Sequence, residues 1–396
     1  MDFKYTPEQE ALRKEFEDFF EEAMRQAPPG WASNLENQYG SDEGMAFHRA
    51  MGRKLGEKGW LSLPWPKEYG GQAHTVIEQF IFNEVRGYHR APGVDMFGVG
   101  MLAPTLLMSG TEEQKQQYLP PIAKGAIQWC QGWSEPDAGS DLAALTTRAV
   151  RDGDEYVING QKIWSTGAHH SDWCFMLART DPEQPRHRGL SFFLVDMKTP
   201  GITLRPIPNM ANEHMFNEIF FDDVRVPKQN MVGEENRGWY VTLMTMNFER
   251  SGVTGFASGR RTIEELVQFC RQTKRDGQPL AKDPFVRHRL AQLFIENEVG
   301  HAMAHKVAWL QHKGEMAAGE AAAAKVYGSE LAQRVAYTVC QILGLYSQVK
   351  GGSKWAPFGG GFEATYQACL GMNIAAGSSE VMRNIIALRG LELPRG

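Results

Sequence analysis

The chain has 396 residues, of which 42% are apolar and 22% are charged, and its net charge is −5 at pH 7. This length exceeds one ordinary core and the composition is globular, so we expect two or three domains. The mildly acidic balance gives no support for a nucleic-acid or anionic-membrane partner. The charged N-terminal stretch does not resemble a signal peptide, and no apolar run reaches the length of a membrane span.

Five cysteines and eleven histidines limit the redox and metal chemistry. The cysteines are scattered without a Cys-x-x-Cys pair, which argues against structural zinc and disulfides and favours a reducing, cytoplasmic location. The histidines form no HExxH-like cluster, and the adjacent pair His169 and His170 would point to opposite faces of a strand. The GVG at 98–100 lacks the third glycine of a dinucleotide fingerprint. We therefore expect no metal and no nicotinamide site.

The first part of the chain, residues 1–126, has a helical pattern. The sequence TPEQ at 6–9 places a threonine N-cap, a proline at the first helical position and a capping-box glutamine before an apolar-periodic run. The sequence TEEQ at 111–114 repeats the capping box. We expect Pro120 and Pro121 to end that second helix.

The pattern changes near residue 127. From there to 237 the residues alternate in polarity, and Asp152-Gly153 and Asn159-Gly160 are typical turn pairs of antiparallel hairpins. Further strand candidates are GLSFFLVDM (189–197), ITLRPIP (202–208) and NEIFFDDVRVP (217–227). This segment is predicted to be a β-barrel or sandwich.

The last part, residues 238–396, is again helical, and its segment 314–345 is rich in alanine and other strong helix formers. A glycine-rich run at 350–362 is predicted to be a loop. The fold class is therefore a multidomain α+β protein with helical, β and helical domains at 1–126, 127–237 and 238–396.

The most distinctive stretch is GWSEPDAGSDLA at 132–143. Alone, it is best interpreted as a tight loop joining two domains, in which Glu135 and Asp141 cap backbone amides. The sequence QKIWSTG at 161–167 follows a strand and combines an indole with two hydroxyls. Trp164 alone is more often a core residue than a ligand platform, but the two stretches together could frame a planar ring.

A carboxylate and a guanidinium are neighbours in NFERSG at 247–252. In isolation, Glu249 and Arg250 are best interpreted as a solvated pair. The functional interpretation places Glu249 in an apolar site, where its pKa would rise and suit a base for a weakly acidic C–H proton.

Four segments resemble signatures of the acyl-CoA dehydrogenase family, in family order and spacing. They are WSEPDAGSDLA (133–143), INGQKIWSTG (158–167), CQILG (340–344) and AGSSEVMRNIIA (376–387). The resemblance covers nearly the whole chain. It implies a C-terminal four-helix bundle and FAD-dependent α,β-dehydrogenation of an acyl-CoA thioester in lipid catabolism, with electron-transfer flavoprotein as acceptor.

The resemblance also implies roles for individual residues. The flavin contacts would be Trp133, Ser134, Ser140, Trp164, Ser165 and Thr166. Gln341 and Gly344 match a segment that meets FAD across a subunit interface, and Ser378 and Glu380 would lie near the FAD phosphates or ribityl chain. Acyl-CoA would contact Ser140, Asn247 and Arg250. A homodimer or homotetramer is expected, and a hetero-oligomer is an alternative.

Many members of the family carry a catalytic glutamate in the C-terminal turn, where this chain has Ala375 and Ala376. A smaller, bacterial branch places the glutamate before an arginine on a helix of the C-terminal domain, as in Glu249-Arg250. The resemblance therefore implies Glu249 as base and the backbone N–H of Ala376 as a donor to the thioester oxygen.

Two other functions share the expected fold. One is a flavin oxidase or monooxygenase acting on a substrate without CoA. The other is a structural subunit that completes the FAD site of a partner.

The chain departs from the family pattern at one FAD contact. Where the family often has an arginine followed closely by Phe-Gly, this chain has a region containing Lys274 and Arg275.

Overall fold

The computed structural model describes residues 4–29, 31, 38–245 and 252–394. Its contacts divide the chain into two compact units, each built from several chain segments. The helical unit consists of 1–33, 75–91 and 250–396, and the sheet unit consists of 34–74 and 92–249. The predicted domain boundaries, after 126 and after 237, concern the order of segments along the chain and stay a prediction.

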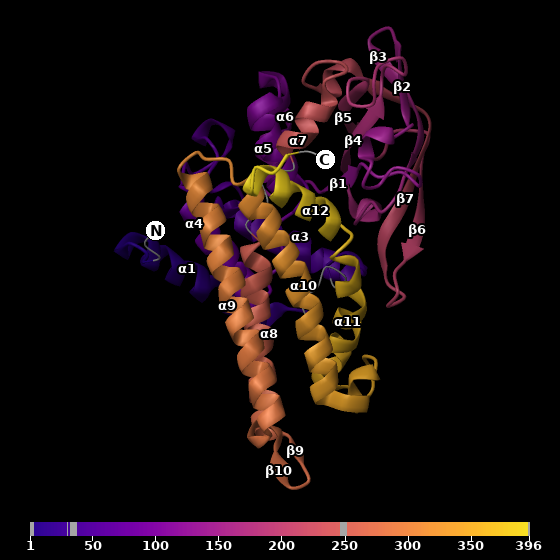
Figure 1. Cartoon of the computed structure of the whole chain (residues 1–396). Coiled ribbons are helices and arrows are strands. Elements are labelled where there is room, and N and C mark those ends of the chain that lie inside the picture. The colour runs from indigo at the N-terminus through magenta and orange to yellow at the C-terminus, as the bar shows by residue number, and fades with distance from the viewer. Residues whose placement is uncertain (1–3, 30, 32–37, 246–251, 395–396) are drawn as a thin grey trace. The chain divides into compact units, whose positions relative to one another are not determined.

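The sheet unit contains one eight-stranded sheet (Figure 1). Its strands are β1 (Trp129–Gly132), β2 (Arg148–Asp152), β3 (Glu155–Lys162), β4 (Trp173–Arg179), β5 (Leu190–Asp196), β6 (Ile202–Pro208), β7 (His214–Pro227) and β8 (Met231–Val232). The spatial order is β6-β7-β3-β2-β4-β5-β8, with β1 parallel to β4. The three additional strand candidates are confirmed as β5, β6 and the larger part of β7.

One of the two predicted turns is confirmed and the other is wrong. Asp152 ends β2, and the chain reverses through Gly153 into the antiparallel strand β3. Asn159 and Gly160 instead lie inside β3, at an irregularity in its pairing with β7. A side chain at Gly160 would meet the backbone of Thr147 at 2.7 Å. The dipeptide therefore serves a bulge with close backbone approach and not a turn.

Four α-helices among the described residues belong to the sheet unit. They are α3 (Asp42–Glu57), α5 (Ala103–Ser109), α6 (Glu112–Ala123) and α7 (Gly238–Thr245). The capping box at Thr111 and Gln114 is confirmed. The expectation that Pro120 and Pro121 end this helix is wrong, because α6 continues through both. They lie in its last turn, where each proline removes only its own hydrogen bond to the preceding turn and few helical residues follow, and Ile122 after them is buried in the core.

The helical unit contains α1 (Pro7–Ala23), α4 (Val76–His89), α8 (Val253–Gln272), α9 (Pro284–His312), α10 (Ala318–Leu343), α11 (Gly361–Gly371) and α12 (Ser379–Ile385). The capping box of α1 is confirmed. The long helices α8, α9 and α10 pack against one another, α4 packs on α8, and α11 and α12 pack on α10 (Figure 1). A small hairpin of β9 (Lys274–Arg275) and β10 (Gln278–Pro279) lies between α8 and α9 in sequence.

The glycine-rich run 350–362 is only partly a loop. Its first residues form turns, Pro357–Gly360 is a short 3-10 turn, and α11 begins at Gly361.

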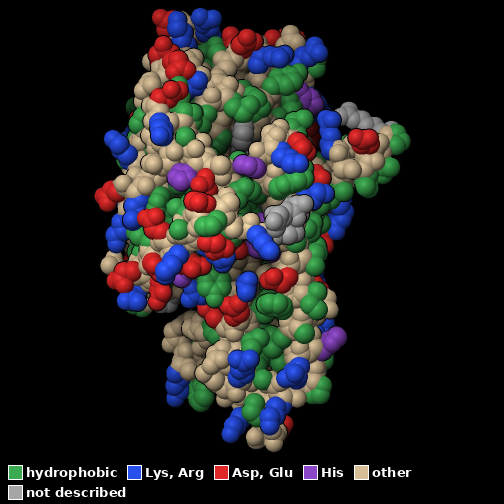
Figure 2. Space-filling model, turned by 90° about the vertical axis from the view of Figure 1, so that its left-hand side faces the viewer, with side chains coloured by type: hydrophobic (Ala, Val, Ile, Leu, Met, Phe, Trp, Pro, Cys, Tyr) green, Lys and Arg blue, Asp and Glu red, His purple; other side chains and the backbone are tan. Residues whose placement is uncertain are grey.

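Figure 2 shows acidic and basic side chains interspersed over one face of the molecule. Within the described ranges, no helix combines the length and apolarity needed to cross a bilayer. The same residues contain no group of three or more metal-ligating side chains.

Candidate active site

The distinctive loop after β1 is anchored by a buried carboxylate. Glu135 accepts hydrogen bonds from the amide of Thr146 (2.6 Å), the hydroxyl of Thr146 (2.9 Å) and the amide of Thr147 (2.9 Å). The Nζ of Lys162, at the end of β3, lies 2.7 Å from its Oε1 and also donates to the carbonyl of Trp133 (3.3 Å). The loop is thus tied to β3 and to the start of β2.

Electrostatics keep this carboxylate ionised. Burial raises the pKa of Glu135, but the ammonium of Lys162 and the donated hydrogen bonds outweigh burial and lower it to about 2. Burial lowers the pKa of Lys162 in turn, against the attraction of Glu135. Glu135 is therefore committed to holding the loop and has no free lone pair with which to accept a substrate proton.

The stretch after β3 lies beside this loop. The amide of Ile163 donates to the carbonyl of Ser134 (2.9 Å). Trp164 follows with a left-handed backbone (φ +62°), and 56% of its surface is exposed. Its ring meets Phe216 edge-on, with the centroids 5.8 Å apart. The neighbouring Ser165 is only 1% exposed.

The sheet unit therefore brings most predicted flavin contacts together. Trp133 is buried, Ser134 and Thr166 are half-buried, and the indole of Trp164 is open to solvent. Ser140 is exposed farther along the loop, beside Asp141, which pairs with Arg186 at 2.8 Å.

In the helical unit, the turn before α12 is exposed and strained. Ala376 has a left-handed backbone (φ +53°), followed by Gly377 (φ +90°). The Nζ of Lys325, on α10, donates to the carbonyls of Met372 (3.0 Å) and Gly377 (2.6 Å). Ser378 caps α12 by accepting from the amide of Val381 (3.3 Å). Lys325 thus fixes the turn through two of its carbonyls, while residues 374–376 of the turn stay exposed to solvent.

Glu380 lies in the first turn of α12 and is exposed. Hydrogen bonds from its own amide and from Ser378 lower its pKa. Gln341 and Gly344 lie at the end of α10 and are exposed, and Arg275 of β9 donates to the carbonyl of Ile342 between them (3.0 Å). The β9–β10 hairpin is thereby fixed to this helix end.

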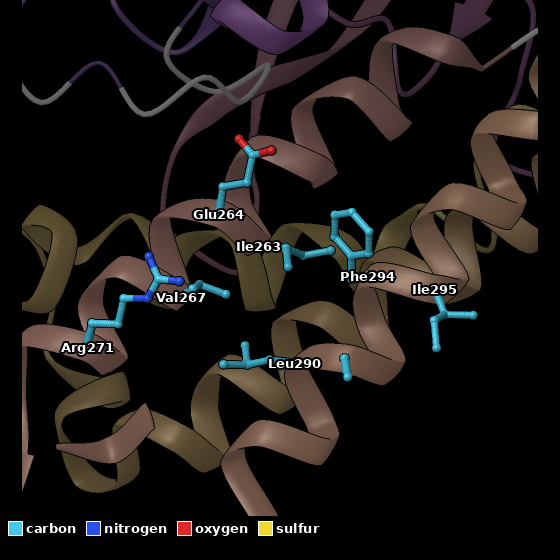
Figure 3. A pocket seen from close by; sticks show the side chains of 8 residues that line it. Ile263, Glu264, Val267, Arg271, Leu290, Phe294 and Ile295 are labelled. Carbon is cyan, nitrogen blue, oxygen red and sulfur yellow. The ribbon is translucent and has the colours of Figure 1, made fainter. Parts of the chain in front are cut away.

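Three predicted residues, Asn247, Glu249 and Arg250, lie outside the described residues. An open hollow of about 500 Å³ between α8 and α9 is lined mainly by apolar side chains, among them Ile263, Leu290 and Phe294 (Figure 3). None of the described site candidates lines it.

The comparison with known families decides the identity of the fold. The N-terminal, middle and C-terminal domain families of the acyl-CoA dehydrogenases match residues 6–126, 130–224 and 236–391. The chain belongs to the acyl-CoA dehydrogenase family. The predicted fold class, with a helical, a β and a helical domain, is thereby confirmed.

Relatives of this acyl-CoA dehydrogenase match over the full length. Acyl-CoA dehydrogenase FadE26 of Mycobacterium tuberculosis is 36% identical over 403 residues, covering 100% of this chain and 99% of the relative. The solved Tcur3481-Tcur3483 steroid ACAD has a TM-score of 0.89 at 34% identity, with 100% of both chains covered. The ChsE4-ChsE5 complex from Mycobacterium tuberculosis has a TM-score of 0.87 at 35% identity, again with 100% of both chains covered.

Acyl-CoA dehydrogenases are FAD-dependent oxidoreductases, and the predicted cofactor is confirmed at the level of the family. Three of the segments that resemble family signatures contain or adjoin buried polar atoms without a hydrogen-bond partner among the described residues. They are Nε1 of Trp133 and Oγ of Ser165 in the sheet unit, and Oδ1 of Asn373 and Oγ of Ser379 beside the α12 turn. Buried polar groups normally have partners, so these stretches of this dehydrogenase have donors and acceptors left for a polar cofactor.

Sequence reasoning missed several side chains that shape the site. Lys162 was not recognised as the partner of Glu135, although both lie in family-like segments. His169 and His170 lie in a short 3-10 turn, so the opposite directions expected of them on a strand do not apply, and their ring centroids are 4.1 Å apart. The adjacent histidines were the available indication of a polar cluster behind Trp164.

Proposed function

We propose that this protein dehydrogenates an acyl-CoA thioester to the 2,3-enoyl-CoA, with Glu249 as the base for the α-proton. The observation that supports this base is a turn without an acid: Ala375 and Ala376 stand where many relatives have their glutamate. Other carboxylates of the resembling segments are poor candidates. Glu135 is fully engaged by Lys162 and backbone amides, and the pKa of Glu380 is lowered in a solvent-exposed position.

Each remaining part of the site has a role in this proposal. The exposed backbone N–H of Ala376 donates to the thioester oxygen and stabilises the negative charge that develops as the α-proton leaves. FAD, when bound, accepts the β-hydrogen as hydride. Ser140, Asn247 and Arg250 hold the acyl-CoA, and Arg250 does so as a permanent cation.

The proposed FAD contacts are taken for each unit by itself. In the sheet unit, the flavin contacts are Trp133, Ser134, Ser140, Trp164, Ser165 and Thr166. In the helical unit, Ser378 and Glu380 lie near the phosphates or ribityl chain. Gln341 and Gly344 contact FAD across a subunit interface.

The base assignment is tested by Glu249→Gln in the FAD-loaded protein. We expect unchanged FAD content and a loss of about 10²- to 10⁴-fold in the anaerobic rate of flavin reduction. Glu234→Gln, the same change at an exposed residue before α7, serves as control and should reduce at the normal rate. Equal reduction rates in both variants would remove Glu249 from this role.

The substrate is found by mixing the oxidised protein anaerobically with a panel of acyl-CoA esters. Because one similar structure is described as a steroid ACAD, the panel should contain steroid side-chain, branched, aromatic and straight-chain esters. Bleaching by one class identifies the acyl group. A yellow protein that no ester bleaches would favour a flavoenzyme that does not use CoA.

We propose electron-transfer flavoprotein as the acceptor. An oxidase is the alternative, since the prolyl acyl carrier protein oxidase AnaB has the same fold at 26% identity and a TM-score of 0.82. Slow reoxidation of the reduced flavin by O₂, with fast reoxidation by electron-transfer flavoprotein, supports the dehydrogenase. Fast reoxidation by O₂ alone supports the oxidase.

We further propose that the protein works as an oligomer, either of identical chains or with a second, related chain. The similar solved structures include two complexes named for two different chains. Purification of this chain alone separates the cases. A yellow homodimer or homotetramer supports the first, and a colourless chain that gains FAD with a partner supports the second.

A further inference from the structure

The backbone of Trp164 needs an explanation. A bulky residue with positive φ is strained, and such a conformation persists only where the surroundings over-determine it. Trp164 has φ +62° and keeps its indole exposed on the segment proposed to face the flavin. Contacts of the buried residues next to Trp164 must therefore hold its backbone in this conformation.

Asn217, a fully buried residue of β7, makes three hydrogen bonds with the next residue of the segment. The amide of Ser165 donates to the carbonyl of Asn217 (3.0 Å), and the amide of Asn217 donates to the carbonyl of Ser165 (3.2 Å). The side-chain Nδ2 of Asn217 donates to the same Ser165 carbonyl (3.1 Å). Two residues further on, the amide of Gly167 donates to the carbonyl of Met215 (2.9 Å).

Two histidines fix the orientation of the Asn217 amide. Nε2 of His169 lies 3.1 Å from the carbonyl of Tyr39, so it carries the hydrogen and Nδ1 is an acceptor. Nδ2 of Asn217 donates its second hydrogen to that Nδ1 (2.9 Å). Nε2 of His214 donates to Oδ1 of Asn217 (2.8 Å), and the His169 and His214 rings stack at 3.9 Å. A flipped amide would set oxygen against oxygen at Ser165.

We infer that Asn217, oriented by His169 and His214, is a positioning residue that sets the conformation of Trp164, Ser165 and Thr166 toward the flavin. The inference rests on the proposed flavin-facing role of that segment. Removing the Nδ2 donor leaves the Ser165 carbonyl with one hydrogen bond fewer and frees the strained Trp164 to relax. The flavin would then meet a displaced indole and a displaced hydroxyl.

The test is Asn217→Asp, a nearly isosteric change that removes the Nδ2 donor and keeps an oxygen for His214. The matched control is Asn230→Asp. Asn230 is also buried in the sheet unit, donates from Nδ2 to a backbone carbonyl (Leu194, 3.0 Å) and accepts from the hydroxyl of Tyr118 (3.3 Å). Both changes delete a hydrogen bond from Nδ2 to a backbone carbonyl, but only Asn217 makes that bond to the residue next to Trp164.

The readouts are the dissociation constant of FAD, the shape of the visible flavin band, and the melting temperature of the protein. We expect both variants to melt at lower temperature. Asn217→Asp alone should weaken FAD binding by about tenfold or more and change the flavin band, because a buried carbonyl loses a donor next to the cofactor. Wild-type FAD affinity and an unchanged band in Asn217→Asp would overturn the inference, as would equal losses in both variants.

If Asn217→Asp does not fold, a second pair of variants tests the inference. His214→Ala removes the donor to Oδ1 of Asn217, and His214→Gln keeps an amide donor there. We expect the alanine variant to weaken FAD binding and the glutamine variant to restore it, and equal affinities would overturn the inference. These measurements need no turnover. A protein that binds FAD but is bleached by no acyl-CoA would contradict the proposed function without touching this result.

Discussion

Glu135 and Lys162 lie side by side in the interior of the sheet unit, and the two charges differ in how many other partners they have. Glu135 also accepts hydrogen bonds from Thr146 and Thr147, whereas among the described residues Lys162 has one further hydrogen-bond acceptor, the carbonyl of Trp133. Glu135→Gln therefore leaves a buried ammonium nearly alone. We expect it to lower the free energy of unfolding by about 3–5 kcal/mol.

Removing the other partner of the pair is expected to lower the free energy of unfolding by less. Lys162→Met leaves a carboxylate that still has its amide and hydroxyl donors, so we expect a loss of about 1–3 kcal/mol. Urea unfolding of both variants measures the difference. If Lys162→Met costs as much as Glu135→Gln or more, the backbone donors contribute less than the structure indicates.

His169 makes the stability of the sheet unit depend on pH. Burial, together with His170 and His214 nearby, lowers the pKa of His169 from 6.5 to about 4. Between these values the unfolded chain binds a proton that the folded chain does not, so stability falls as pH falls from 6.5 to 4. We expect His169→Gln to lose this part of the pH dependence. Urea unfolding at pH 7 and pH 5 measures it, and parallel losses in wild type and variant would contradict the assignment.

At the scale of elements, Gly153 in the β2–β3 turn and Gly160 inside β3 differ in what an added side chain would cost: backbone strain at the first, and a steric clash as well at the second. Gly153, in the β2–β3 turn, has φ +65° and open space around it. Gly160, in the bulge, has φ +149°, and a side chain there would lie 2.5 Å from Oγ1 and 2.7 Å from Cα of Thr147. We expect Gly153→Ala to cost about 1 kcal/mol from backbone strain, and Gly160→Ala to cost about 1–3 kcal/mol more from the clash.

Thermal unfolding of the two variants, followed by circular dichroism, measures this difference. Gly153→Ala is the control for backbone strain without a neighbour. Similar melting temperatures would show that the chain around Thr147 moves aside easily.

The elements predicted well from sequence are those decided by neighbours in the chain. Capping boxes at Thr6 and Thr111 need residues only three positions apart, and both are confirmed. The turn predicted at Asn159-Gly160 was wrong because a bulge and a turn favour the same residues. Which of the two forms depends on the pairing of β3 with β7, about 60 residues away in the chain.

The site shows the same division: its local motifs were predictable from the sequence, and its contacts between distant residues were not. Family-like segments indicated Ser134, Trp164 and their neighbours, and the structure places these two stretches side by side. The supporting contacts were not predictable, because Glu135 and Lys162 are 27 residues apart and Asn217 and His169 are 48 apart. Such pairs depend on strand register, which no local pattern records.

At the scale of the whole molecule, the order of segments along the chain differs from the grouping by contacts. The predicted β segment begins at 127, yet a buried cluster around Trp129 includes residues from earlier helices. Leu106 of α5 and Leu119 of α6 are fully buried in the same cluster as Trp129, Phe175 and Phe192. A strand segment alone would expose these large apolar side chains.

We therefore expect a fragment of residues 127–237 to lack a cooperative fold, because it has lost the helices that cover one face of its sheet. A fragment of residues 92–245 keeps α5, α6 and α7, leaves out α4 of the helical unit, and should melt in one cooperative transition. Circular dichroism during heating and binding of a hydrophobic dye compare the two. A sharp transition in 127–237, with no dye binding, would show that the sheet folds without α5 and α6. The cluster around Trp129 would then be a contact between separately stable parts.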